Sequence, residues 1–250
     1  MVVGLDKFRE KFRKYSGQYV IIGGTACDSN FNAKKMRFRA TKDIDLVIII
    51  EALTVEFAEE FWNFVKEAEY EHLNRSTGRP QFYRFSKPKK EGFPFMIELF
   101  SRRPDFSLSD MEGVLTPIPV DDDISSLSAI VLNDSYYDFM CKGRVLIDDI
   151  SVLNTPCLIV FKAKAWMDLS EKKNRGMDVD STSIKKHKND VFRLATLLKE
   201  DVHQSLPPEI ESDMKLFFRE IEKEQIDLRS LGIRNTKEQL IDLLKSCFSI

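Results

Sequence analysis

The stretch "RATKDIDLVIIIE", residues 39–51, places two aspartates, Asp43 and Asp45, at the mouth of an unbroken apolar run. The run from Leu46 to Ile50 is typical of a strand that is buried on both faces of a covered sheet. An isolated carboxylate at such a position is costly to remove from water. We therefore expect a compensating charge beside this pair of aspartates.

Alternate residues of a strand share one face, with Cα atoms about 7 Å apart. Two carboxylates so placed can hold divalent cations, which lie roughly 4 Å apart in two-metal sites. Oxygen ligands suit Mg²⁺. Two other D-x-D pairs, Asp121/Asp123 and Asp178/Asp180, lie in polar, turn-like surroundings, where a solvated loop is the simpler interpretation.

Composition is typical of a soluble globular protein. The 250 residues are 43% hydrophobic and 31% charged, with a net charge of −2, so any nucleic-acid binding must use local basic patches. No apolar stretch approaches the roughly 20 residues of a membrane span, and the N-terminus lacks the apolar region of a signal peptide. We expect a cytoplasmic protein with no membrane partner. Four scattered cysteines without a C-x-x-C pair suggest neither a zinc site nor a disulfide framework.

The patterns along the chain predict an α+β fold in which a mixed β-sheet flanked by helices is followed by a helical C-terminal domain. We place the boundary near residue 150, giving an α/β catalytic domain at 1–150 and a helical domain at 151–250 that completes the cleft. The expected elements are a helix at 4–15, a strand at 19–22, a helix capped by Thr54, strands within 81–86 and 94–101, a β-like stretch at 128–150, and helices from a Thr155 cap onward with a loop at 170–183.

Two glycines follow the first predicted strand, in "VIIGGTA". Gly23 and Gly24 would let a phosphate approach the backbone closely, and a helix that starts near Thr25 would offer free N–H groups and the positive end of its dipole. An ordinary strand-to-helix turn is the alternative. The acid pair downstream favours the phosphate site.

A third acid, Glu98, lies in the predicted strand "FPFMIELFS" and shares a face with Met96 and Phe100. A lone glutamate among apolar residues needs a partner. It is either an edge-strand residue that reaches water or a third metal ligand on a strand next to Asp43 and Asp45.

Several basic residues are weaker candidates. Arg39 and Thr41 share the phase of Asp43 if the strand extends back to them, and would then face a triphosphate. The alternative is a solvated basic approach to the strand. Lys162 lies in an apolar helical stripe, where it either snorkels to water or reaches a phosphate. The basic loop 87–92 is more simply a solvated hairpin tip than a nucleic-acid contact.

The residues "IIGGTA", "RATKDIDLVI" and "MIELF" together resemble the nucleotidyltransferase superfamily that includes DNA polymerase β, and in particular the AbiEii-type and related minor nucleotidyltransferases. The resemblance covers about residues 19–101 and extends more weakly to "FKAKAW" and "KKHKNDVFRL". The chain departs from the pattern in one respect, because eighteen residues separate Gly24 from Asp43.

This resemblance implies transfer of a nucleoside monophosphate from an NTP to an acceptor hydroxyl. Asp43, Asp45 and Glu98 would hold two Mg²⁺ ions, and Gly23, Gly24 and Thr25 would bind the β,γ-phosphates. Lys162 would contact the triphosphate, and Asp190 would orient Lys162 or Lys188; His187 is more simply a core residue.

The acceptor implied is an RNA such as a tRNA end or a protein hydroxyl, in a toxin or defence role that has a cognate antitoxin as partner. The alternatives are an aminoglycoside-type small-molecule nucleotidyltransferase and a non-catalytic nucleotide-binding module of the same fold.

P-loop and Rossmann enzymes are disfavoured because their glycine motifs are absent from the sequence.

Overall fold

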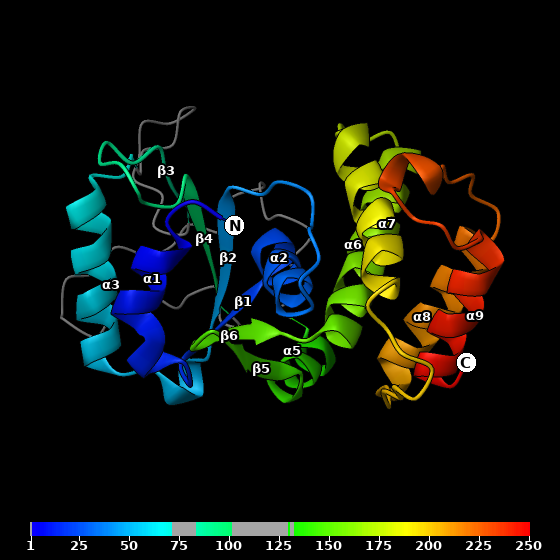
Figure 1. Ribbon diagram of the computed structural model, residues 1–250, viewed down its shortest axis with the longest axis horizontal. Coiled ribbons are helices and arrows are strands. Elements are labelled where there is room, and N and C mark those ends of the chain that lie inside the picture. Colours follow the sequence, from blue (N-terminus) through cyan, green and yellow to red (C-terminus); the bar gives the residue numbers. More distant parts are fainter. Residues whose placement is uncertain (1, 72–83, 102–129, 131–132) are drawn as a thin grey trace. The chain divides into compact units, whose positions relative to one another are not determined.

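The computed structural model describes residues 2–71, 84–101, 130 and 133–250. The described chain is α+β and forms two compact units: the first lies within residues 1–132 and 144–153, and the second comprises 133–143 and 154–250 (Figure 1). The expected boundary near residue 150 lies close to the last passage of the chain between the units. The segment 133–143, which precedes that boundary, is part of the second unit.

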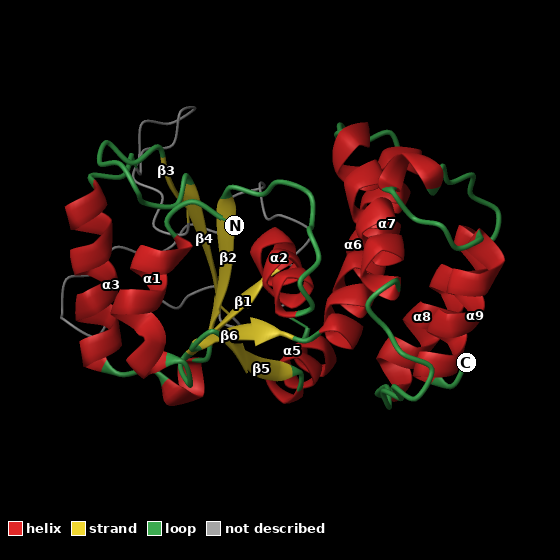
Figure 2. Cartoon of the chain, in the orientation of Figure 1, coloured by secondary structure: helices red, strands yellow, loops and turns green. Residues whose placement is uncertain are grey.

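The first unit is built on a mixed sheet with the strand order β3-β4-β2-β1-β6-β5 (Figure 2). β2 is parallel to β4 and β1 is parallel to β6, whereas the other neighbours are antiparallel. Its elements are α1 (Leu5–Phe12), η1 (Arg13–Tyr15), β1 (Tyr19–Ile22), α2 (Gly23–Ala33), β2 (Asp43–Ile48), η2 (Ile50–Ala52), α3 (Val55–Ala68), β3 (Arg84–Ser86), β4 (Met96–Ser101), β5 (Arg144–Ile147) and β6 (Ile150–Leu153).

One face of this sheet is apolar and aromatic. α1 and α3 cover it, and α2 lies on the other side (Figure 1). The ring of Tyr19 lies 5.5 Å from that of Phe8 on α1, and Phe85 lies 5.5 Å from Phe61 on α3. Since side chains alternate across a strand, the neighbours of these aromatic residues point to the opposite face. The charged residues of β2, β3 and β4 therefore share the face that looks away from α3.

The buried centre of the sheet matches the sequence pattern. Leu46, Val47 and Ile48 are fully buried, as expected for a strand covered on both faces. Thr54 caps α3, because its hydroxyl oxygen accepts a hydrogen bond from the Phe57 N–H at 3.4 Å. Strands β3 and β4 form the expected antiparallel pair; the expected strand start at 81–83 lies outside the described residues.

The β-like interpretation of 128–150 is wrong over its central part, where Asp134–Lys142 forms α5. Asn133 caps this helix, since its side-chain oxygen accepts from the Tyr136 N–H at 3.1 Å. Tyr136, Phe139 and Met140 are buried at helical spacing. The aromatic composition favoured a strand, but the cap and the spacing decide for a helix.

The second unit consists of helices in its described residues, which are α5, α6 (Thr155–Asn174), α7 (Ser181–Ala195), α8 (Pro208–Ile221), η4 (Arg229–Leu231) and α9 (Lys237–Phe248). Asn154, not Thr155, caps α6 and accepts from the Cys157 N–H at 3.0 Å. α6 extends to Asn174, so the loop predicted at 170–183 covers only residues 175–180. In the described part of the chain, none of the helices has the length and apolarity that crossing a membrane requires.

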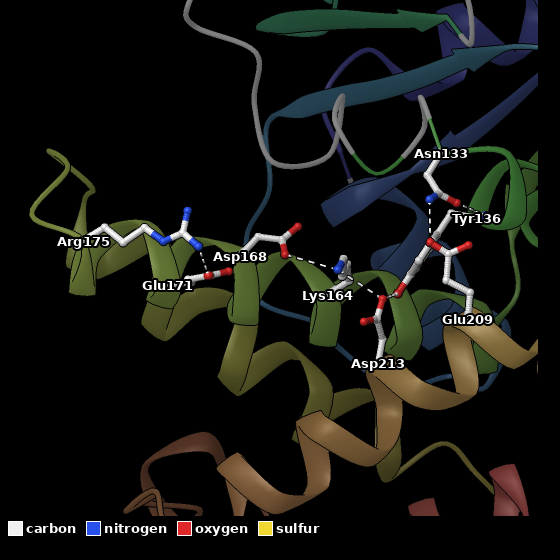
Figure 3. A network of polar contacts seen from close by, with 8 residues as sticks. All are labelled: Asn133, Tyr136, Lys164, Asp168, Glu171, Arg175, Glu209 and Asp213. Carbon is white, nitrogen blue, oxygen red and sulfur yellow. Dashed lines mark hydrogen bonds and ion pairs between the residues drawn. The ribbon is translucent and has the colours of Figure 1, made fainter.

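A polar network joins α5, α6 and α8 inside the second unit (Figure 3). The Tyr136 hydroxyl donates to Asp213 at 2.7 Å, and Lys164 lies 3.1 Å from Asp213 and 3.4 Å from Asp168. Burial and the adjacent Asp213 carboxylate raise the pKa of Tyr136, which keeps its hydroxyl protonated as a donor. The network is satisfied within the unit and stabilises its helix packing.

Asn30 links α2 to the sheet, because its buried side-chain amide donates to the carbonyls of Ala26 at 2.8 Å and Leu153 at 2.9 Å. We expect Asn30→Ala to lower the free energy of unfolding of the first unit by about 1–3 kcal/mol, since it removes the donor to a buried carbonyl. Urea unfolding followed by Trp62 fluorescence in a Trp166→Phe background measures this. Asn32→Ala, on the exposed side of the same helix, is the control, and equal stabilities of the two variants would contradict the assignment.

Candidate functional site

The three predicted acids lie on one face of the sheet. β2 and β4 are parallel neighbours, with Asp45 opposite Glu98 and Asp43 opposite Met96. Adjacent strands lie about 4.8 Å apart, and residues in register point to the same side. Asp43 precedes Asp45 by two positions and shares that side. We call Asp43, Asp45 and Glu98 the acid row. Their backbone positions are adjacent in the sheet.

Gly23 and Gly24, which we call the glycine turn, are the first two residues of α2 and lie beside Asp45, so the helix begins two residues before the predicted start at Thr25. Ile22 pairs with Asp45 across the antiparallel β1–β2 ladder, and α2 begins at Gly23. Gly23 has φ +64°, and a Cβ there would lie 1.7 Å from Asp45 Oδ2. The Asp45 carboxylate therefore lies against the helix N-terminus, where free N–H groups and the dipole favour negative charge. The helix N-terminus thus supplies part of the compensating charge that we expected beside the two aspartates.

Arg39 and Thr41 lie beside the second glycine. A Cβ at Gly24 would be 2.6 Å from Thr41 Oγ1 and 3.8 Å from Arg39 Nη2. β2 begins at Asp43 and does not extend back to them, so the condition under which they would share the phase of Asp43 is not met. They reach the glycine turn through the path of the preceding loop.

That path explains the long spacing between the glycines and the aspartates. α2 takes the chain away from the turn as far as Ala33, and residues 34–42, the return segment, bring it back. Near the far end of α2, the rings of Phe31 and Phe38 lie 5.1 Å apart. Thr41 then contacts the turn at Gly24. The eighteen residues between Gly24 and Asp43 thus consist of the rest of α2 and the return segment.

Thr25 connects the helix to the acid row. Its side chain is fully buried, and its hydroxyl donates to the backbone carbonyl of Asp43 at 2.5 Å. This bond fixes the first turn of α2 against the start of β2. The hydroxyl therefore has a positioning role, and a phosphate contact by Thr25 stays a prediction.

Glu98 has a partner that the sequence did not reveal. Arg84 is its neighbour on β3, and its Nε and Nη2 lie 2.8 Å and 2.7 Å from Glu98 Oε1. The Glu98 side chain is only 13% exposed. The alternation of Arg84 with the buried Phe85, combined with a hairpin register, is the signal that would have found this pair.

The acid row fits a divalent cation in the chemistry of its donors, which are all carboxylate oxygens. In the described residues, however, no three His, Cys, Asp or Glu side chains gather closely enough to hold a metal. Asp45 lies against Gly23, and Glu98 is bound to Arg84. The backbone register thus places the three carboxylates on one face of the sheet, with Arg84 bound to Oε1 of Glu98.

Lys162 and Asp190 form a buried ion pair within the second unit. Lys162 Nζ lies 3.6 Å from Asp190 Oδ2, and their side chains are 3% and 0% exposed. Asp190 also lies 3.4 Å from Arg193 Nη1. Lys162 does not snorkel, and Asp190 orients Lys162 and not Lys188, which contacts Glu224 at 2.6 Å. This burial supports a structural role, and a triphosphate contact by the pair stays a prediction.

The second unit also contains an open pocket of about 1070 Å³ between α6, α7, α8 and the chain after α8. Trp166 and Leu216 contribute apolar surface. Its lining carries equal numbers of basic and acidic side chains and therefore does not favour an anion. These are Lys173, Lys185, Lys188 and Lys223, and Glu171, Glu220, Glu224 and Asp227. None of the predicted site residues lines this pocket.

Comparisons of the chain with models of protein families, with curated proteins and with solved structures find no significant match. The functional argument therefore depends on the geometry of the acid row and the glycine turn.

Gly23 offers a test of that geometry. We expect Gly23→Ala to destabilise the first unit by about 1–2 kcal/mol through the left-handed backbone alone, and further because the new Cβ displaces the Asp45 carboxylate. Urea unfolding followed by Trp62 fluorescence, with Trp166 replaced by Phe, measures the loss. Gly17→Ala is the matched control, since a Cβ at that position would have nothing within 4 Å of it. Equal stability of both variants would refute the contact.

The buried ion pair gives a second test. We expect Asp190→Ala to destabilise the second unit by about 3–5 kcal/mol, because it leaves the buried Lys162 ammonium without this carboxylate. The double variant Lys162→Met, Asp190→Leu should recover most of the loss. Trp166 fluorescence in a Trp62→Phe background reports unfolding of this unit. Glu211→Ala, which removes an exposed pair with Lys215, is the control; a loss as small as that of the control would show that the pair is dispensable.

Proposed function

We propose that this protein is a Mg²⁺-dependent nucleotidyltransferase that moves a nucleoside monophosphate from an NTP to an acceptor hydroxyl. One observation carries the proposal: Asp45 and Glu98 lie in register on adjacent parallel strands, with Asp43 on the same face and the glycine turn against Asp45. A carboxylate set beside a helix N-terminus is suited to binding metal and phosphate together. On this proposal, the first unit has a nucleotidyltransferase-like fold.

Each residue of the site has a role in this reaction. Asp43 and Asp45 would hold two Mg²⁺ ions, and Glu98 would share the one nearer the acceptor. Bound Mg²⁺ neutralises phosphate charge and lowers the pKa of a bound hydroxyl. Glu98, once released from Arg84, takes the acceptor proton. The acceptor oxygen then forms a bond to the α-phosphorus while the bond to the leaving pyrophosphate breaks.

The glycine turn and the return segment bind the triphosphate. The glycine turn would let phosphate oxygens approach its backbone closely, because neither Gly23 nor Gly24 has a side chain. Arg39 and Thr41, beside Gly24, add a guanidinium and a hydroxyl. Positioning and charge neutralisation of this kind account for most of phosphoryl-transfer catalysis. A toxin or defence role with a cognate antitoxin belongs to the same proposal, on the resemblance alone.

A second candidate is a nucleotide-binding module of the same fold that performs no transfer. The Arg84–Glu98 ion pair favours it, because a guanidinium already satisfies the acid that the transfer reaction needs. The two candidates differ in whether an acceptor becomes labelled, which the following experiment measures.

We expect the protein, incubated with Mg²⁺ and α-³²P-labelled NTPs, to label an acceptor in total RNA or in a protein lysate. Asp43→Ala and Asp45→Ala should each reduce labelling by about a hundredfold or more, the scale of removing a group that stabilises developing charge. Asp178→Ala is the matched control, because Asp178 belongs to a D-x-D pair in the turn before α7. Labelling that is absent, or equal in all four proteins, would exclude transfer to RNA or protein.

A further inference from the structure

A strongly basic surface adjoins the acid row. The return segment carries five cations in nine residues, and the sequence has no acid between Asp28 and Asp43. Most of these side chains are exposed. In a chain of net charge −2, this is a local excess of positive charge that suits a polyanion. The cations are Lys34, Lys35, Arg37, Arg39 and Lys42.

The cations are held on an ordered backbone. Just after α2, Lys35 adopts the left-handed conformation at φ 57°, and the Met36 N–H donates to the Phe31 carbonyl at 2.9 Å. Phe38 then packs on Phe31. Lys34 and Lys35 lie at the negative end of the helix dipole, which stabilises them there. A surface that is ordered before binding loses less conformational entropy when a ligand binds.

An exposed aromatic ring lies next to this segment. The side chain of Phe95, just before β4, is 48% exposed. Its backbone N–H donates to the Lys42 carbonyl at 3.2 Å, and its carbonyl accepts from the Lys87 N–H at 2.9 Å. Lys42 Nζ lies 5.9 Å from the ring centroid. Phe95 is thus fixed between the return segment and the basic loop 87–92.

The loop contributes less charge than the return segment. Lys87 lies 3.5 Å from Glu71, and Lys90 lies 3.0 Å from Glu69. These exposed pairs are weak and screened by salt, but they reduce the positive potential on that side of Phe95. The return segment has five cations and no acid, whereas the loop has three lysines and one glutamate, so the return segment carries the larger net positive charge.

We propose that the return segment and Phe95 form a binding surface for single-stranded nucleic acid. Cations bind the phosphates, and an exposed ring beside them stacks on a base. A duplex keeps its base faces inside the stack and cannot use the ring. An acidic peptide satisfies the charge but offers no base for Phe95. Lys42 directly precedes Asp43, so a bound strand lies close to the acid row; the further idea that this strand is the acceptor rests on the proposed function.

Fluorescence anisotropy with the full-length protein tests the surface. The probe is a fluorescein-labelled 12-nucleotide RNA of mixed sequence, in EDTA and without NTP, so that catalysis plays no part. We expect Phe95→Ala to weaken binding by about 5- to 150-fold, the effect of losing one stacked base. Arg37→Gln and Lys42→Gln should each lower the slope of log K against log salt by about 0.7.

Matched controls come from the second unit. Leu216→Ala removes an exposed apolar side chain and Lys199→Gln an exposed cation, and both should bind RNA as the wild type does. The same RNA as a duplex should bind more weakly and show no effect of Phe95→Ala. Equal binding by Phe95→Ala and the wild type, or binding to anionic vesicles without binding to RNA, would overturn the proposal. If the wild type binds RNA but labels no acceptor in the transfer experiment, only the proposed function is refuted.

Discussion

The site depends on the contact between the Asp45 carboxylate and the backbone of Gly23. Oδ2 of Asp45 occupies space that a side chain at position 23 would need. This contact places a carboxylate of β2 against the N-terminus of α2, and the hydrogen bond from Thr25 to the Asp43 carbonyl connects the same two elements within the first turn of α2. The buried strand can therefore begin with two aspartates, because the helix end offsets part of their charge.

Different groups offset the negative charges of the acid row. The N-terminus of α2 lies against Asp45, whereas Arg84 forms an ion pair with Glu98. In the structure Glu98 is paired with Arg84, so the proposed cation would meet a carboxylate that already has one positively charged neighbour.

The sequence predicted the parts of this structure that depend on local patterns. The buried strand, the glycine turn and the cap at Thr54 each follow from a few neighbouring residues. Arg84 was missed because its contact with Glu98 depends on the register of two strands. α5 was misread because its aromatic composition is strand-like, although the Asn133 cap indicated a helix. The position of Arg39 beside Gly24 could not be predicted from strand alternation, because β2 begins at Asp43 and the return segment brings Arg39 there.

The central claim is that Asp43, Asp45 and Glu98 form a divalent-cation site. Electron paramagnetic resonance of Mn²⁺, titrated into the protein without nucleotide, tests it most directly because free and bound Mn²⁺ give different signals. The proposed site predicts that the wild type removes free Mn²⁺ from solution, that Asp45→Asn abolishes this, and that Glu98→Gln weakens it. Circular dichroism establishes that the variants are folded. Equal Mn²⁺ binding by the wild type and folded Asp45→Asn, or no binding by either, would contradict the claim.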